Sequence, residues 1–294
     1  MTPSDHDYLC KFLKQSSGLD LSRDKEYLLE SRLLPLSRSL GLSGIRELVL
    51  KLREGTPSIA SRVVEAMTTN ETFFFRDKVP FDNFREILPE MLRARAARRS
   101  LRIWCAAGST GQEPYSLAMI LKETGAALAG WRLEILATDL SQEVLEKSKA
   151  GVYSQLEVQR GLPAHLLVKY FEQSGELWRI KADVRAMVQH RQLNLLSDCS
   201  RLGIFDIIFC RNVLIYFDQE TKIGIFNRLA KLVDADGFLV LGAAETTVGL
   251  TELFKPHAQR RGFYEPSQSL AKPSRRGADG TNASIVAATV GRCE

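Results

Sequence analysis

The chain has 294 residues, 45% hydrophobic and 26% charged, which are ordinary values for a globular protein and predict a sizeable core in two domains. The net charge is +5, but seven Lys/Arg and three Asp/Glu lie from Lys255 onward, so residues 1–254 are nearly neutral and nucleic acid is disfavoured as a partner. Five cysteines without a CxxC pair and four scattered histidines argue against a disulfide framework and a metal site.

The N-terminal region, residues 1–75, is predicted to be a small helical domain. Its first ten residues are polar and acidic, unlike a secretory signal, and no apolar run in the chain approaches the ~18 residues that span a membrane. Leucines recur at three- and four-residue spacing from Leu29, which predicts a packed helix that Pro35 kinks or splits and Gly41 ends. Residues 43–55 predict another amphipathic helix. We expect a cytoplasmic protein without membrane insertion.

A linker helix is predicted over residues 76–100, and arginines crowd its end. Five of them fall within ten residues that contain no acid: Arg93, Arg95, Arg98, Arg99 and Arg102. Two interpretations stay open. The cluster is either a solvated helix end or a patch that faces an anionic partner.

From residue 101 the pattern changes to short apolar runs that alternate with helical stretches. This alternation predicts an α/β, Rossmann-like fold over 101–265, with a mostly parallel sheet covered on both faces. Strands are expected at 101–105, 133–138, 205–210 and 238–242. Residues 170–195 break the rhythm and predict three strands in a small inserted antiparallel β subdomain. The tail, 266–294, has little aromatic content and is predicted to be disordered.

The turn after the first of these strands has the layout of a nucleotide-binding loop. Gly108 and Gly111 precede a helix with proline in its first turn, and glycine lets the backbone approach a ligand closely. Asp139 ends the next strand, where doubly wound folds hold a ribose diol. An ordinary tight turn and a helix cap are the alternatives, although Ser141 is better placed to cap the helix.

The same region favours S-adenosylmethionine over a dinucleotide. The loop lacks both G-x-G-x-x-G and a P-loop lysine, and Glu113 would oppose a phosphate but tolerate a cationic ligand. After the strand at 205–210 there is no (Asp/Asn)-Pro-Pro-(Tyr/Phe) tetrad, which methyltransferases use to hold an amide or adenine nitrogen. A carboxylate nucleophile fits this sequence better.

Five segments, in order, resemble the chemotaxis receptor methyltransferase family of the CheR type. They are TNETFFFRD at 69–77, AAGSTGQEPYSLAM at 106–119, ATDLSQEVLEKSKAGVY at 137–153, LNLL at 193–196 and FDIIFCRNVLIYFD at 205–218. The resemblance implies a small N-terminal all-α domain, a Rossmann-like S-adenosylmethionine methyltransferase sheet and an antiparallel insert. It also implies a protein-glutamate O-methyltransferase that modifies the cytoplasmic helical region of a methyl-accepting chemoreceptor in chemotactic adaptation. The product would be S-adenosyl-L-homocysteine.

The resemblance further implies the residues of the site. Cofactor contacts are expected, together with Gly108 of the turn, at Asn70, Thr72, Arg76, Glu113, Asp139, Asn194, Leu195, Asn212 and Val213. Arg76 with Thr72 would meet the methionyl carboxylate, Asp139 the ribose hydroxyls, and Asn194–Leu195 the adenine edge. Arg76 and Tyr216 are the candidates for orienting the substrate. Packing at the sheet edge is the alternative role for Tyr216.

Two departures from the family pattern refine the expectation. Residues 242–245 read Gly-Ala-Ala-Glu where the family often has Gly-His-Ser-Glu, so a polar role for those two side chains is absent. The short turn at 174–176 predicts that no C-terminal pentapeptide tether is bound. Two other functions stay open: a catalytically silent scaffold that binds receptor or cofactor, and a methyltransferase for a small-molecule carboxylate.

Overall fold

The computed structural model describes residues 1–22 and 25–267. Residues 1–67 form a helical unit, called here the N-terminal lobe, with helices α1 (Pro3–Ser17), α2 (Glu26–Ser39), α3 (Ile45–Arg53) and α4 (Pro57–Met67). Leu29, Leu33 and Leu36 of α2 are buried in a core shared by the four helices. Pro35 is exposed inside α2 and does not split it. The lobe therefore has a core of its own, as the leucine spacing predicted.

A seven-stranded sheet follows α5 (Val79–Ala94). Its strands are β1 (Ser100–Cys105), β2 (Arg132–Asp139), β6 (Val188–Gln192), β7 (Phe205–Cys210), β8 (Val233–Leu241), β9 (Phe254–Pro256) and β10 (Phe263–Pro266). The order across the sheet is β6-β2-β1-β7-β8-β10-β9. Neighbours from β6 to β8 are parallel, whereas β10 is antiparallel to both β8 and β9. The predicted Rossmann-like sheet is confirmed.

The two faces of this sheet bury alternate residues of each strand, as the period of a strand requires. Ile103 and Cys105 of β1 lie in the core that includes α5 and α6 (Gln112–Thr124). Trp104 and the following Ala106 lie in the opposite core, with α11 (Gln219–Ala230). Helix α7 (Gln142–Ala150) packs beside β2 and β6. Both faces are covered, so the parallel strands are apolar throughout their centres.

A separate three-stranded antiparallel sheet has the order β3-β5-β4. Its strands are β3 (Val152–Ser154), β4 (Phe171–Ser174) and β5 (Leu177–Ile180), and the short helices α8 (Gln155–Gln159), α9 (Ala164–Tyr170) and α10 (Ala182–Arg185) flank it. The prediction of three consecutive strands within 170–195 is wrong for the last one. Residues 188–192 form β6 of the main sheet, where Val188 pairs with Ile135 of β2. By pairing with β2 in parallel, β6 satisfies backbone N–H and C=O groups that would otherwise be unpaired at the edge of the sheet.

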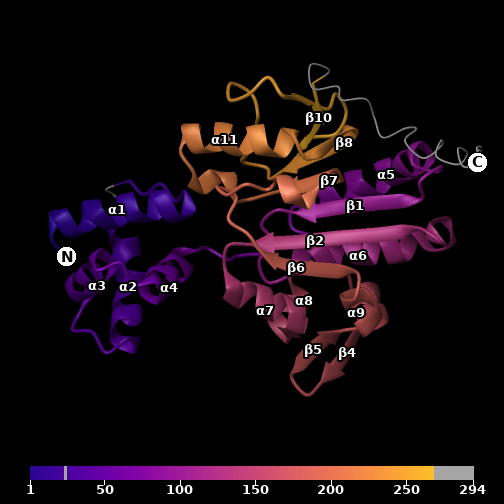
Figure 1. The fold of residues 1–294 in the computed structure, drawn as a ribbon. Coiled ribbons are helices and arrows are strands. Elements are labelled where there is room, and N and C mark those ends of the chain that lie inside the picture. The colour runs from indigo at the N-terminus through magenta and orange to yellow at the C-terminus, as the bar shows by residue number, and fades with distance from the viewer. Residues whose placement is uncertain (23–24, 268–294) are drawn as a thin grey trace, which may run out of the picture.

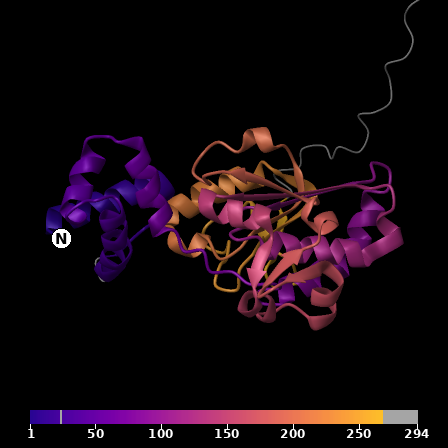
Figure 2. The same cartoon turned by 90° about the horizontal axis from the view of Figure 1, so that it is seen from below.

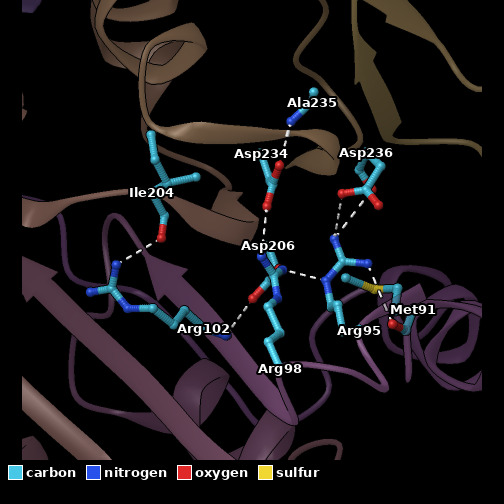
Figure 3. Close-up of polar contacts among 9 residues, drawn as sticks. All are labelled: Met91, Arg95, Arg98, Arg102, Ile204, Asp206, Asp234, Ala235 and Asp236. Carbon is cyan, nitrogen blue, oxygen red and sulfur yellow. Dashed lines mark hydrogen bonds and ion pairs between the residues drawn. The ribbon is translucent and has the colours of Figure 1, made fainter. Parts of the chain in front are cut away.

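Three of the five clustered arginines, Arg95, Arg98 and Arg102, fit neither interpretation. They form ion pairs within the sheet domain instead of facing solvent or an anionic partner. Figure 3 shows Arg95 and Arg98 on either side of the Asp206 carboxylate, which both contact. The same network includes Arg95–Asp236 at 3.0 Å, Arg98–Asp234 at 3.1 Å and, on the neighbouring strand, Arg102–Glu134 at 2.8 Å. These aspartates lie at the amino ends of β7 and β8 and are far apart from the arginines in sequence. The charges of these three arginines are therefore neutralised by carboxylates within the fold.

The carboxyl ends of β1 and β2 point toward the N-terminal lobe (Figure 1). Seen from below, the lobe again lies beside the sheet domain and not over its faces (Figure 2). The strand order reverses between β1 and β7, because the chain first moves outward through β2 and β6 and then returns. Open α/β sheets bind ligands at such a switch point. The tail predicted to be disordered lies, from residue 268 onward, outside the described residues.

Candidate functional site

A cavity opens at the carboxyl ends of β1, β2, β6 and β7 and is closed on its other side by the N-terminal lobe. Most of the residues expected from the sequence line it: Asn70, Thr72, Arg76, Asp139, Asn194, Leu195, Asn212, Val213 and Tyr216. Gly108 and Glu113 do not. The lobe contributes Ser17, Leu19, Val64 and Met67, which sequence reasoning missed because nothing local marks them as ligand-facing.

The loop after β1 is shaped by what lies behind it. Gly108 donates its N–H to the carbonyl of Thr138 at 2.8 Å, and a Cβ at this position would lie 3.1 Å from the Cβ of Ala137. Gly111 begins α6 with φ of 98°, and a Cβ there would lie 2.9 Å from the Tyr153 hydroxyl. Both glycines thus let the loop pack tightly against β2 and α7. Ala107 and Ser109, not Gly108, reach the cavity wall.

Asp139 ends β2 with its carboxylate held by backbone amides. Ser109 N donates to Oδ2 at 2.9 Å, and Ser141 N donates to Oδ1 at 3.0 Å. Ser141 itself caps α7 through Val144 N, as predicted. Burial raises the pKa of Asp139 above its ordinary value, although the amides oppose this shift. Each oxygen keeps a second lone pair, so the carboxylate can still accept hydrogen bonds from ligand hydroxyls.

Arg211 lies at the cavity wall and connects three elements there. Its guanidinium donates to Glu113 Oε2 at 2.7 Å, to Asp77 Oδ2 at 2.8 Å and to the carbonyl of Arg76 at 2.8 Å. Burial raises the pKa of Glu113, and the charge of Arg211 opposes this shift. The Nε of Arg211 is buried and has no hydrogen-bond acceptor among the described residues. Glu113 is therefore the counter-ion of Arg211, a role that the sequence alone did not reveal.

The segment that carries Arg76 has an uncommon backbone. Phe75, Asp77 and Lys78 have φ of 52°, 66° and 45°, a region that residues other than glycine rarely adopt. Arg211 fixes this turn through its two contacts with Arg76 and Asp77. Strained backbone of this kind concentrates at functional sites, where the surroundings hold it. The Arg76 guanidinium lies at the cavity and donates to the carbonyl of Glu71 at 2.6 Å.

The N-terminal lobe contacts the segments that follow three of these strands, β2, β6 and β7. The Glu65 carboxylate accepts hydrogen bonds at the start of α7, from the Ser141 hydroxyl and from Gln142 N at 3.2 Å. Asn194 donates its side-chain amide to the carbonyl of Ser16 at 2.7 Å. The carbonyl of Tyr216 accepts from the backbone N–H of Asp20 at 2.9 Å. The lobe is thus part of the site and not only a neighbour of it.

Within residues 1–22 and 25–267, no three His, Cys, Asp or Glu side chains gather closely enough to hold a metal ion. In the same ranges, no helix has the length and hydrophobicity needed to cross a bilayer.

Two family models match the chain. The model described as the CheR methyltransferase, all-alpha domain, matches residues 4–68, and the model described as the CheR methyltransferase, SAM binding domain, matches residues 70–263. Chemotaxis protein methyltransferase 1 of Pseudomonas aeruginosa is 41% identical over 259 residues, which are 86% of this chain and 93% of that protein. Chemotaxis protein methyltransferase 1 of Vibrio cholerae is 40% identical over 262 residues, 87% of this chain and 94% of that protein. The chemotaxis protein methyltransferase of Salmonella typhimurium is 34% identical over 256 residues, 85% of this chain and 86% of that protein.

Proposed function

Because the chain belongs to the CheR methyltransferase family, we infer that it is an S-adenosylmethionine-dependent methyltransferase that forms methyl esters on glutamate side chains of bacterial chemoreceptors. One observation carries this conclusion. Relatives called chemotaxis protein methyltransferases are about 40% identical across both the helical and the cofactor-binding regions. A catalytically silent scaffold is not favoured. The division into a helical domain over 1–75, a linker over 76–100 and a catalytic domain over 101–265 stays a proposal. The family matches at 4–68 and 70–263 support two regions, with residues 70–100 matched together with the second.

The side chains at the cavity fit this cofactor. We propose that Asp139 accepts from the ribose hydroxyls, that Arg76 with Thr72 binds the methionyl carboxylate, and that Asn194 with Leu195 meets the adenine. Gly108, Glu113, Asn212 and Val213 belong to the proposed site as well, the first two from behind the wall. When bound, the cofactor supplies a methyl group on a sulfonium, which is a good leaving group.

The proposed chemistry needs little acid or base assistance from the chain. A glutamate substrate has a reference pKa near 4.3, so its carboxylate is ionised at neutral pH and can attack without a general base. The chain must exclude water from this carboxylate and hold it in line, which is the role proposed for Tyr216 and Arg76. Arg211 is already neutralised by Glu113 and Asp77, so it would not over-stabilise the incoming carboxylate.

The finer identity of the partner is also a proposal. We propose that the substrate segment is the cytoplasmic helical region of a methyl-accepting chemoreceptor and that the protein works in the cytoplasm. The turn between β4 and β5 consists of only Gly175 and Glu176, which supports binding without a C-terminal pentapeptide tether. Calorimetry with such a pentapeptide tests this point. Micromolar binding would contradict it.

A transfer assay tests the function itself. The full-length protein is incubated with receptor-bearing membranes and S-adenosylmethionine that carries a tritiated methyl group. We expect label in the receptor band and its release as methanol in base, which is specific to a methyl ester. Receptors with glutamine at the modified positions are the control and should take up no label. Label confined to small molecules, or no label with either receptor, would overturn the proposal.

A further inference from the structure

Glu245 has a buried carboxylate whose two oxygens are both occupied by backbone amides. Oε2 accepts from Asn212 N at 2.8 Å and from Gly242 N at 2.7 Å. Oε1 accepts from Val213 N at 2.9 Å and from Leu214 N at 2.7 Å. Glu245 is 9% exposed, so water does not replace these bonds easily. Four donors on one carboxylate is a complete hydrogen-bonding shell, and three of them come from consecutive residues of one turn.

The turn needs this anion because of its backbone conformation. Asn212 has φ of 58°, in the left-handed region, so the N–H groups of residues 212–214 converge on one point instead of alternating. A concave arrangement of backbone amides of this kind attracts an anion. Without one, one buried and two partly buried donors would be unsatisfied beside the cavity.

The close approach of the loop after β8 to the turn at 212–214 also depends on Gly242. A Cβ at this position would lie 2.7 Å from Glu245 Oε2 and 2.9 Å from Asn212 Nδ2. The two residues between them, Ala243 and Ala244, are exposed. The loop after β8 therefore holds the turn through the Glu245 carboxylate, although two other side chains of the family pattern are missing here.

We propose that Glu245 is a positioning residue for the cofactor site: its carboxylate fixes the turn at 212–214, so that Asn212 and Val213 form the cavity wall. Glu245 does not line the cavity, so it acts through the turn and not by touching a ligand. The inference rests on the proposed function, because it assigns Glu245 to the cofactor half of that site.

The test is Glu245→Gln in the full-length chain. Glutamine keeps the size of the side chain, but its NH2 group would face two of the N–H donors. We expect the dissociation constant for S-adenosylhomocysteine, measured by calorimetry, to rise at least about tenfold, because losing charge-assisted hydrogen bonds to the turn has an effect of about this size. Amide hydrogen exchange should accelerate at 212–214 and stay unchanged in the N-terminal lobe. Glu252→Gln, which removes an exposed carboxylate from the same loop, is the matched control and should change neither.

A second variant keeps the test decisive if Glu245→Gln fails to fold. Gly242→Ala inserts a methyl group between the Glu245 carboxylate and Asn212 without requiring an unusual φ, and it should weaken the same affinity. Wild-type affinity in a folded variant of either kind would overturn the inference, as would faster exchange spread over the whole sheet. Failure of the wild type to bind S-adenosylhomocysteine would instead count against the proposed function.

Discussion

The ammonium group of Lys14 lies 2.6 Å from the carboxylate of Asp218, and this pair joins the end of α1 in the N-terminal lobe to the first turn of α11. The same carboxylate caps α11 by accepting from Thr221 N at 2.9 Å. These contacts, with the side chain of Lys14 first, lower the pKa of Asp218 to about 2. One side chain therefore serves both the lobe contact and a helix cap, and the two roles can be separated.

Asp218→Asn should keep the cap and lose the ion pair, whereas Asp218→Ala should lose both. Asparagine caps helices as well as aspartate, so we expect the alanine variant to be less stable than the asparagine variant by about 1 kcal/mol. Urea unfolding of the two variants measures this difference. Lys14→Ala should have only a small further effect in the Asp218→Asn background, where a 3.9 Å contact with the half-exposed Asp20 is left. An additional loss as large as that of Lys14→Ala in the wild type would show that the pair with Asp218 is not what Lys14 contributes.

Asp139→Ala should weaken the binding of S-adenosylhomocysteine by ~1–3 kcal/mol, which corresponds to roughly 5- to 150-fold, because hydrogen bonds to a buried carboxylate are lost. Calorimetry with the purified variant measures the effect. Asp198→Ala removes an exposed aspartate and serves as the control. Unchanged affinity in the Asp139 variant would remove this residue from the proposed site.

Arg95→Met should destabilise the fold without affecting the cofactor site. The Arg95 side chain is buried beside Asp206 and Asp236 (Figure 3). Asp206 lies at the amino end of β7, whereas the cavity lies at the carboxyl ends of the strands. Removing one member of a buried ion pair typically costs ~3–5 kcal/mol. Urea unfolding should report that loss, while Arg93→Met, at an exposed position in the last turn of α5, should cost little. A large change in S-adenosylhomocysteine affinity of folded Arg95→Met would contradict this assignment.

Gly111→Ala should impair both stability and cofactor binding, because the added methyl group would meet the Tyr153 hydroxyl and the Ser148 side chain at a φ of 98°. Gly175→Ala is the matched control. It also has a positive φ, of 61°, but its added methyl group would meet no atom within 4 Å, so only the ~1 kcal/mol backbone cost is expected. Thermal melting and calorimetry compare the two. Equal losses of stability and affinity in the two variants would show that the contacts of Gly111 with Tyr153 and Ser148 do not contribute.

His190 predicts a pH dependence of stability. Its ring accepts or donates a 2.7 Å hydrogen bond with Ser148, and burial lowers the pKa of His190 to about 4. In the unfolded chain this histidine takes up a proton near its ordinary pKa of about 6.5. The free energy of unfolding should therefore fall as the pH drops from about 6.5 toward 4, because the unfolded state binds the proton first. Urea unfolding at several pH values should give a flatter profile for His190→Gln, and identical profiles would contradict the prediction.

The sequence alone predicted the features that local pattern controls. Short continuous apolar runs placed β1, β2, β7 and the second half of β8, because strands covered on both faces are apolar throughout. The leucine spacing placed α2, because a helix buries one face at its own period. Asp139 was placed correctly at the end of β2 for the same reason. The small residues after β1 predicted a tight turn before a helix, since their backbone freedom is a local property.

The tertiary structure decided everything that depends on partners distant in the chain. The strand at 188–192 could pair with its neighbour in sequence or with β2, because the apolar pattern within a strand does not specify its partner; in the structure it pairs with β2. The charges of Arg95 and Glu113 looked available until Asp206 and Arg211, more than ninety residues away, were found to neutralise them. Nothing in the sequence around Glu65 indicates a contact with the sheet domain, and the family pattern at 242–245 includes Glu245 without indicating which groups its carboxylate binds. Their roles arise because each carboxylate accepts hydrogen bonds from backbone amides that are distant in sequence and that only the tertiary fold brings close to it.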